Sequence, residues 1–296
     1  MAGISNARKG DIIISFEILL WSFFPILTII SLNSLNFAYS LAFTFLIASV
    51  FFLAIIAYGK KWSDFLHMPS MKYVLGATFF IGLYYALVFY GLQFTTAGNS
   101  SIILLMEVFF SFLILGMLLG KERITSNGGV GALLMVLGAI IVLFRGGFHF
   151  NAGDIIILAA TAFPPFGNYL MQKARKNVSS VTIMFIRSLV TSAFMLLIGL
   201  LFFDFPGSSE LRASMPFLMI SGILLFGLSK ILWMEAIHRI PITRAVSLST
   251  ISPAFTLVFA FFILKEIPTA FQIAGLVPLV AGALLMLRES AEEMPT

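Results

Sequence analysis

Five ionisable side chains lie inside apolar stretches of this chain: Glu17, Glu107, Arg187, Lys230 and Glu235. A charge at bilayer depth costs about 3 kcal/mol or more on insertion scales, so it normally faces a cavity or an opposite charge. Glu107 lies eight residues after Asn99, near the middle of its stretch, which is where membrane proteins place substrate and ion sites. We therefore predict that Glu107 binds a proton or a substrate. The alternative is a structural ion pair with Arg187 or Lys230.

Arg187 and Lys230 are the two basic residues expected within the membrane. Each lies a similar distance from the inner end of its apolar stretch, since Arg187 is seven residues after Ser180 and Lys230 is nine before Arg239. Together they could clamp a carboxylate or a phosphate, Arg through its planar fork and Lys as a point charge. Alternatively, they neutralise Glu107 or Glu17.

Other polar and aromatic residues could line the same cavity. Glu17 and Trp21 share a helix face at i,i+4 spacing, and a carboxylate beside an indole can hold an amine; Glu17 could instead reach the interface, and Trp21 could simply pack. Asn168, Tyr85 and Trp233 are further candidates for the cavity wall, the alternatives being interhelical hydrogen bonding and core packing. Glu235 is expected to pair with Arg239 at i,i+4 spacing.

The elements that must position these residues are transmembrane helices. Apolar residues make up 60% of the 296-residue chain, and only 10% of its residues are charged, whereas soluble domains carry about 25%. We predict an all-α polytopic membrane protein with spans at 11–31, 37–58, 71–93, 98–119, 127–145, 153–173, 180–203, 215–238, 243–264 and 269–288.

The chain has no cysteine and three scattered histidines, so neither disulfides, thiol catalysis nor a metal centre is expected, and no cofactor is predicted. We interpret the net charge of +5 as a signal of how the chain is oriented in the membrane, and not of nucleic-acid binding. With the N-terminus inside, 13 of the 18 Lys and Arg fall on the inner side, three on the outer side and two within the membrane. Both termini are therefore predicted to be cytoplasmic.

The chain also shows an internal duplication. The segment 99–122 and the segment 243–266 both end in Lys-Glu, and the Gly-Asp-Ile-Ile-Ile that begins at Gly10 recurs at Gly153. We predict two five-helix repeats, 1–150 and 151–296. Because five is odd, the second repeat enters the membrane from the opposite side, so the two are inverted.

These features resemble the drug/metabolite transporter superfamily, in its ten-helix EamA-type branch. The matching residues are LLWSFFP around Trp21, the Lys-Glu pairs at 121–122 and 265–266, Ser252-Pro253, and the glycine-spaced helices 127–145 and 269–288. The order of these motifs over two repeats covers almost the whole chain. One departure is Phe109, which stands where the other repeat has Pro253 and where relatives often carry proline.

The sequence favours a secondary transporter that moves a small metabolite by alternating access, with Glu107 coupling transport to protons. One buried anion and two buried cations suit a zwitterion, and the resemblance implies amino acids, related metabolites or drugs, commonly exported. Exporters of organic cations and exchangers of phosphorylated metabolites are the alternatives. A membrane-embedded enzyme is disfavoured because no nucleophile-base pair or metal-ligand cluster is recognisable at depth. We expect a small-molecule substrate, a bacterial inner membrane, no nucleic-acid partner, and a homodimer if the glycine-spaced helices pack between subunits.

Overall fold

A computed structural model describes residues 6–59, 62–66, 68–114, 126–144, 151–240 and 242–292. Every regular element in these ranges is a helix. Five long helices are continuous: α3 (Phe37–Gly59), α4 (Met68–Leu92), α7 (Ser126–Phe144), α10 (Ser180–Phe202) and α15 (Ala270–Glu292). A short 3₁₀ helix, η1 (Trp62–Leu66), joins α3 to α4.

The other helical segments are interrupted. The first pair is α1 (Asn6–Trp21) with α2 (Phe24–Leu32), and the second is α5 (Ala97–Leu104) with α6 (Met106–Phe112). Two more pairs follow, α8 (Ala152–Ala160) with α9 (Pro164–Ala174), and α13 (Ile242–Ser249) with α14 (Ser252–Leu264). Between them, α11 (Ser208–Ile220) continues through a π-helical stretch, η3 (Ser221–Leu228), into α12 (Ser229–Ile237).

Prolines account for three of the interruptions. A proline cannot donate to the carbonyl four residues earlier and clashes with it. The helices α1, α8 and α13 end four residues before Pro25, Pro164 and Pro253, respectively. The position of each proline in the sequence therefore determines where the helix breaks.

The fourth interruption has no proline. Helix α5 ends at Leu104 and α6 begins at Met106, although Phe109 stands where the other half has Pro253. At this point the chain tightens, since Leu105 N donates to Ile102 O at 3.1 Å and Val108 N to Leu105 O at 3.0 Å, both three residues apart. The break between α5 and α6 is therefore present without a proline that would explain it.

Six helices or helix pairs are long and apolar enough to cross a membrane. They are Asn6–Leu32, Phe37–Gly59, Pro69–Leu92, Ser180–Phe202, Ser208–Ile237 and Arg244–Leu264. Shorter apolar helices cover Ala97–Phe112, Gly128–Leu143 and Ala270–Leu285. The chain is therefore a multi-pass membrane protein, and all ten apolar stretches seen in the sequence contain helix in the described residues. The end of the predicted 98–119 span lies outside those residues.

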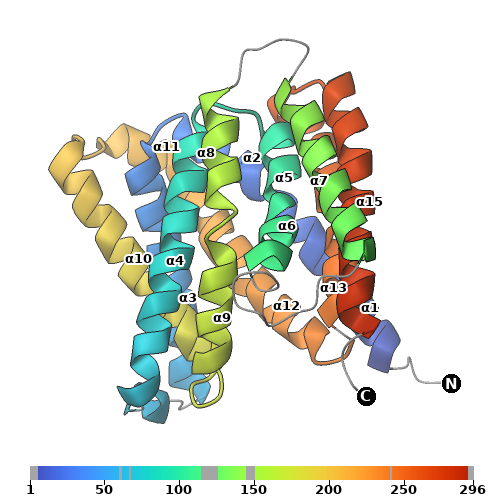
Figure 1. The fold of residues 1–296 in the computed structure, drawn as a ribbon. Helices are drawn as coiled ribbons and strands as arrows, with labels where there is room; N and C mark the ends of the chain where they lie inside the picture. The colour runs from blue at the N-terminus through green and yellow to red at the C-terminus, as the bar shows by residue number, and fades with distance from the viewer. Residues whose placement is uncertain are drawn as a thin grey trace, which may run out of the picture.

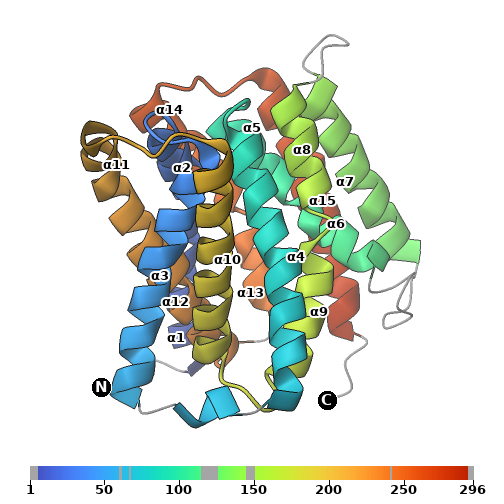
Figure 2. The same cartoon turned by 90° about the vertical axis from the view of Figure 1, so that its left-hand side faces the viewer.

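The helices form one bundle, with a group of long helices at each of two opposite edges (Figure 1). Helices α7 and α15 lie side by side at one edge, α3, α4 and α10 lie at the other, and interrupted helices such as α5, α6 and α12 lie between them (Figures 1 and 2). The start of α1 and the end of α15 lie at the same end of the bundle (Figure 1).

Glycines allow a close backbone contact between α7 and α15. A Cβ on Gly138 would lie 2.6 Å from Gly275 O, and a Cβ on Gly282 would lie 2.4 Å from Gly131 O. These distances to backbone atoms leave no room for a side chain. The glycines of these two glycine-spaced helices therefore pack against each other within the chain.

Candidate functional site

Glu17 and Lys230 meet in the interior, between α1 and α12. Lys230 Nζ lies 3.9 Å from Glu17 Oε1, and Ser229 Oγ donates to the same oxygen at 2.9 Å. Glu17 is 4% exposed, and the Lys230 side chain is 17% exposed. Burial makes each charge costly alone, so each compensates the other. Glu17 is therefore buried inside the helix bundle, beside Lys230.

Trp21 extends this pair into an aromatic cluster. Lys230 Nζ lies 3.2 Å from the centroid of the Trp21 ring, a cation–π contact. Trp21 stacks on Phe24 at 4.9 Å and meets the edge of Phe226 at 5.7 Å between ring centroids. Phe226 in turn meets Tyr85 of α4 at 5.1 Å. The cluster thus connects Trp21 with Tyr85, two of the residues predicted to line a cavity.

Glu107 lies in the first turn of α6, two residues after the interruption at Leu105. Asn168 Nδ2 of α9 donates to Glu107 Oε1 at 3.4 Å, a long hydrogen bond between two interrupted helices. Glu107 keeps some accessible surface, and Asn168 is exposed. Within the described residues Glu107 forms no ion pair, so the structural pairing considered for it is not seen.

Arg187 projects from α10 and is 6% exposed. Its Nε is buried without a hydrogen-bond partner, and it forms no ion pair with any residue in the described ranges. It does lie within electrostatic range of Tyr85 and Lys230. A buried guanidinium normally has an anionic or hydrogen-bonded partner, so this position is incompletely satisfied in the protein alone.

Lys230 and Tyr85 lie among the buried charges. Lys230 interacts electrostatically with Glu17, Arg187 and Glu107, and Tyr85 interacts with the same three. The structure therefore brings together seven of the eight predicted cavity residues: Glu17, Trp21, Tyr85, Glu107, Asn168, Arg187 and Lys230. Trp233 is the exception, because it packs against the apolar cluster that contains Ile14 and Ile18.

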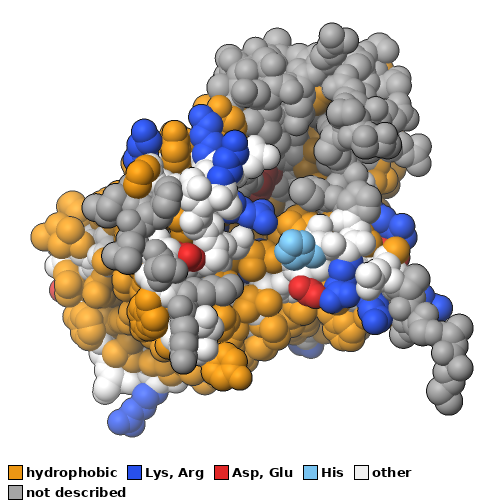
Figure 3. Space-filling model, turned by 90° about the horizontal axis from the view of Figure 1, so that it is seen from below, with side chains coloured by type: hydrophobic (Ala, Val, Ile, Leu, Met, Phe, Trp, Pro, Cys, Tyr) orange, Lys and Arg blue, Asp and Glu red, His pale blue; other side chains and the backbone are white. Residues whose placement is uncertain are grey.

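Seen from the end that carries the start of α1, the molecule is hollowed near its centre (Figure 3). Lys and Arg side chains gather on this face, and an acidic side chain is visible deep in the hollow (Figure 3). The accessible surface that Glu107 and Lys230 retain is consistent with access from this side.

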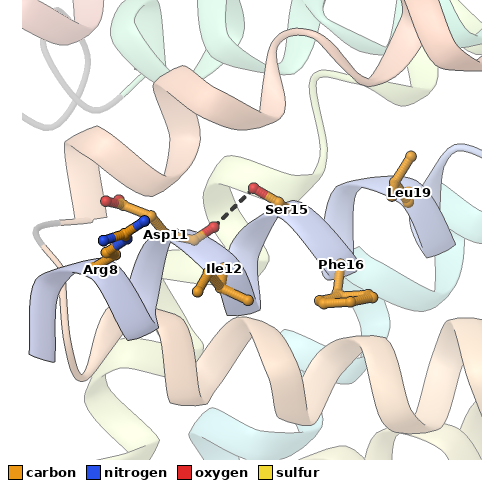
Figure 4. A pocket seen from close by; sticks show the side chains of 6 residues that line it. All are labelled: Arg8, Asp11, Ile12, Ser15, Phe16 and Leu19. Atoms are coloured by element: carbon orange, nitrogen blue, oxygen red, sulfur yellow. Dashed lines mark hydrogen bonds between the residues drawn. The ribbon is translucent and has the colours of Figure 1, made fainter. Parts of the chain in front are cut away.

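A separate groove of about 390 Å³ runs along the outer face of α1 (Figure 4). Its lining residues are Arg8, Asp11, Ile12, Ser15, Phe16 and Leu19. Glu17 is buried on the same helix, and the groove shares no lining residue with the buried charges. It is an open surface groove and not part of the candidate site.

A polar network at the opposite end of the bundle was not predicted from the sequence. Asp154 of α8, fully buried, accepts hydrogen bonds from Thr95 and, at 2.9 Å, from Asn99 Nδ2. Gln272 Nε2 of α15 donates to Asn99 Oδ1 at 2.7 Å. The network ties α5, α8 and α15 together. In the sequence, Asp154 is a carboxylate beside an apolar run and marks the repeated Gly-Asp-Ile-Ile-Ile segment.

Glu266 caps the start of α5 at the same end of the bundle. Its carboxylate oxygens accept from the backbone N–H groups of Ala97 at 3.0 Å and Gly98 at 3.2 Å, at the start of α5. These N–H groups have no partner within the helix, so a carboxylate there satisfies them and complements the helix dipole. Together, Glu266 and the Asp154 network close this end of the bundle around α5.

Ion pairs also lie at the other end of the bundle. Arg244 Nη2 lies 2.8 Å from Asp11 Oδ2, which links α13 to α1. Arg239 Nε donates to Glu235 Oε1 at 3.0 Å, so the predicted i,i+4 pair is confirmed. Among the described residues, no group of His, Asp and Glu has the arrangement of a metal site.

Comparisons with known proteins agree with this architecture. A model of the EamA-like transporter family matches twice, over residues 8–144 and 151–288. A solved structure titled only as a protein crystal structure superposes with a TM-score of 0.68 at 21% identity, over 97% of this chain and 99% of that one, and so shares its fold.

Two archaeal relatives are named uncharacterized transporters. One, from Methanothermobacter thermautotrophicus, is 31% identical over 66% of this chain. The matched part of the chain spans 58% of that relative's length. The other, from Archaeoglobus fulgidus, is 25% identical over 94% of this chain and 96% of its own length. Two family matches that together cover nearly the whole sequence carry the assignment: the chain belongs to the EamA-like transporter family of the drug/metabolite transporter superfamily.

Proposed function

We propose that this protein is a secondary active transporter for a small zwitterionic metabolite of the amino-acid type. The observation that carries the proposal is the pairing of the buried charges. Glu17 and Lys230 compensate each other, which leaves Glu107 and Arg187 as one carboxylate and one guanidinium without an ion-pair partner in the described part of the chain. A ligand with both an ammonium and a carboxylate would satisfy both groups.

The alternative substrates fit these charges less well. An organic cation would find Glu107 but would leave Arg187 buried and uncompensated. A phosphorylated metabolite carries nearly two negative charges, and Lys230 is already engaged by Glu17 and Trp21. An enzymatic function would need a nucleophile beside a base or a metal cluster, and the charges at this site form neither arrangement.

Glu107 is the proposed coupling residue. A carboxylate held only by a long bond from a neutral amide can exchange a proton for a cationic ligand group, since it can be charged or neutral without breaking an ion pair. Proton release and substrate binding at one carboxylate would then exclude each other. The drive is accordingly a proton gradient or exchange, and we propose export as the direction.

The proposed architecture is ten spans in two inverted repeats, 1–150 and 151–296, that alternate access to the site. Two observations support it. The family model matches each half once, and the interruption at Leu105 lies 145 to 146 residues before the interruption at Thr250 and Ile251, close to the 144 residues that separate Glu122 from Glu266. Discontinuous helices at corresponding positions are typical of transporters built in this way.

The orientation and the membrane are part of the same proposal. Basic side chains gather at the end that carries the start of α1 and the end of α15 (Figure 3), so this end faces the cytoplasm, with both termini. The hollow opens to this side and the Asp154 network closes the other, which corresponds to an inward-facing state. We propose a bacterial inner membrane as the location.

Transport in proteoliposomes tests the function. Purified protein is reconstituted, and uptake of labelled amino acids, the corresponding amines and phosphorylated sugars is compared in parallel, with and without an imposed pH gradient. Amino-acid uptake above that of protein-free liposomes is the expected result. Uptake of amines alone, or of phosphorylated sugars alone, would replace the zwitterion by that class, and no uptake of any compound would contradict the transporter assignment for this site.

A further inference from the structure

A second unsatisfied polar group lies one turn from Arg187 on α10. Thr191 Oγ1 is buried without a hydrogen-bond partner, and the residue is 4% exposed. Residues four apart on a helix share one face, with Cβ atoms about 6 Å apart. Buried hydroxyls and guanidinium groups are nearly always satisfied in native proteins. Two exceptions on one helix face point to a missing partner common to both.

Helix α4 packs directly against this face of α10, where Gly82 lets the two helices approach each other closely at Thr191. The two helices pack side by side (Figure 2), and a Cβ added at Gly82 would lie 3.0 Å from Thr191 Oγ1, with no atoms other than those of Thr191 among its nearest neighbours. Tyr85 lies three residues further along α4 and is within electrostatic range of Arg187. The wall opposite the two polar groups is thus a glycine and a phenol.

We propose that Arg187 and Thr191 form the subsite that binds the carboxylate of the transported molecule, beside Gly82 and Tyr85. The inference rests on the proposed function and assigns one end of its substrate. A guanidinium offers a planar fork of donors that matches the two oxygens of a carboxylate, and the Thr191 hydroxyl supplies one further donor.

The charge at this end fits a single carboxylate. Lys230 is held by Glu17 at 3.9 Å and lies against the Trp21 ring, so Arg187 is the one cation of the buried group that lacks an ion-pair partner in the described ranges. One positive charge balances one carboxylate, whereas a phosphate monoester near neutral pH would keep an uncompensated charge in a buried site. Glu107, which also interacts with Tyr85, is left for the ammonium end.

Matched ligands separate this subsite from the rest of the site. The probes are L-phenylalanine and L-leucine, the amine that each gives on loss of its carboxylate, and the acid that each gives on loss of its amine. Binding to the purified protein is measured as ligand-induced thermal stabilisation. The native protein should bind each amino acid about ten-fold or more tightly than the amine, the range expected for a charge-assisted hydrogen bond.

Arg187→Gln should abolish that preference, lowering affinity for the amino acid and the acid about ten-fold while changing affinity for the amine less than about two-fold. Thr191→Val keeps the shape of the side chain and removes a hydroxyl that has no partner, so it should fold normally and weaken only the carboxylate-bearing probes, by about three-fold. Arg212→Gln, which removes an exposed guanidinium from α11, should change nothing.

Three results would overturn the subsite. They are failure of the native protein to bind any carboxylate-bearing probe, unchanged carboxylate binding in Thr191→Val and Arg187→Gln, or equal weakening of amine and amino acid. Transport is scored separately. Uptake of amines without carboxylate binding would reject the subsite and leave a transporter, and carboxylate binding without any uptake would reject the transporter and leave the subsite.

Discussion

The ion pair between Glu17 and Lys230 can be tested by breaking it from one side and then from both. Lys230→Met removes the ammonium and leaves the Glu17 carboxylate at 4% exposure. At 3.9 Å the Coulomb interaction is about 4 kcal/mol for an effective dielectric constant of 20. The Ser229 bond remains and the carboxylate can take up a proton, so we expect a net loss of about 3 kcal/mol.

The double variant, Glu17→Gln with Lys230→Met, removes both charges. Because no uncompensated charge is then buried, most of the loss should be recovered, to within about 1 kcal/mol of the native protein. Thermal unfolding in detergent, followed by the circular dichroism of the helices, measures both. A loss of 1 kcal/mol lowers the melting temperature of a domain of 150 to 250 residues by about 2 to 4 °C, so a loss of about 3 kcal/mol corresponds to roughly 6 to 12 °C.

Lys9→Met is the matched control, because Lys9 is exposed on α1, and its melting temperature should stay within about 2 °C of the native value. The pairing would be refuted if Lys230→Met melted at the native temperature. It would be refuted equally if adding Glu17→Gln lowered the stability further, since the two residues would then act independently.

Two further substitutions test the packing of the bundle. Phe109→Pro should cost no more than about 1 kcal/mol, because the helix already breaks at Leu105, whereas Ala48→Pro in the continuous α3 should cost about 3 kcal/mol or more; equal losses by thermal unfolding would contradict the break. Gly138→Val would place its Cβ 2.6 Å from Gly275 O and should lower the stability by about 3 kcal/mol. Gly129→Ala, whose Cβ would meet nothing within 4 Å, should be neutral or stabilising, and a loss there similar to that of Gly138→Val would show that steric fit between α7 and α15 is not the cause.

The sequence predicted the helices well because the physical signals were local. Apolar length determined where helices could lie, and Pro25, Pro164 and Pro253 each stand four residues after the end of a helix. The interruption at Leu105 could not be predicted in the same way. Position 109 carries no proline, so the sequence offers no local signal for this break.

The candidate site was predictable as a set of residues but not as a set of pairs. Buried charges are rare enough in a membrane segment to stand out, which is how Glu107, Arg187 and Lys230 were found. The carboxylate that pairs with Lys230 is determined by the packing of α1 against α12. From the sequence alone, Glu17 and Glu107 were equally possible partners. Trp233 was selected for its closeness to Lys230 in the sequence, but the two side chains have different surroundings.

Polar residues near the ends of helices were the least predictable. Asp154 and Gln272 are more than a hundred residues apart and meet through Asn99. Each alone resembles an ordinary interfacial residue, and Thr191 alone resembles an ordinary helix hydroxyl. Their roles follow from what the neighbouring helices do or do not offer them as partners, and that information is absent from a single sequence.

The central claim is that Glu107 couples substrate movement to protons. The most direct measurement compares native protein and Glu107→Gln in proteoliposomes, recording substrate uptake driven by a pH gradient and substrate exchange without a gradient. The claim predicts that Glu107→Gln loses gradient-driven uptake, since an amide cannot release a proton, and retains measurable exchange. Gradient-driven uptake at the native rate in Glu107→Gln would contradict it.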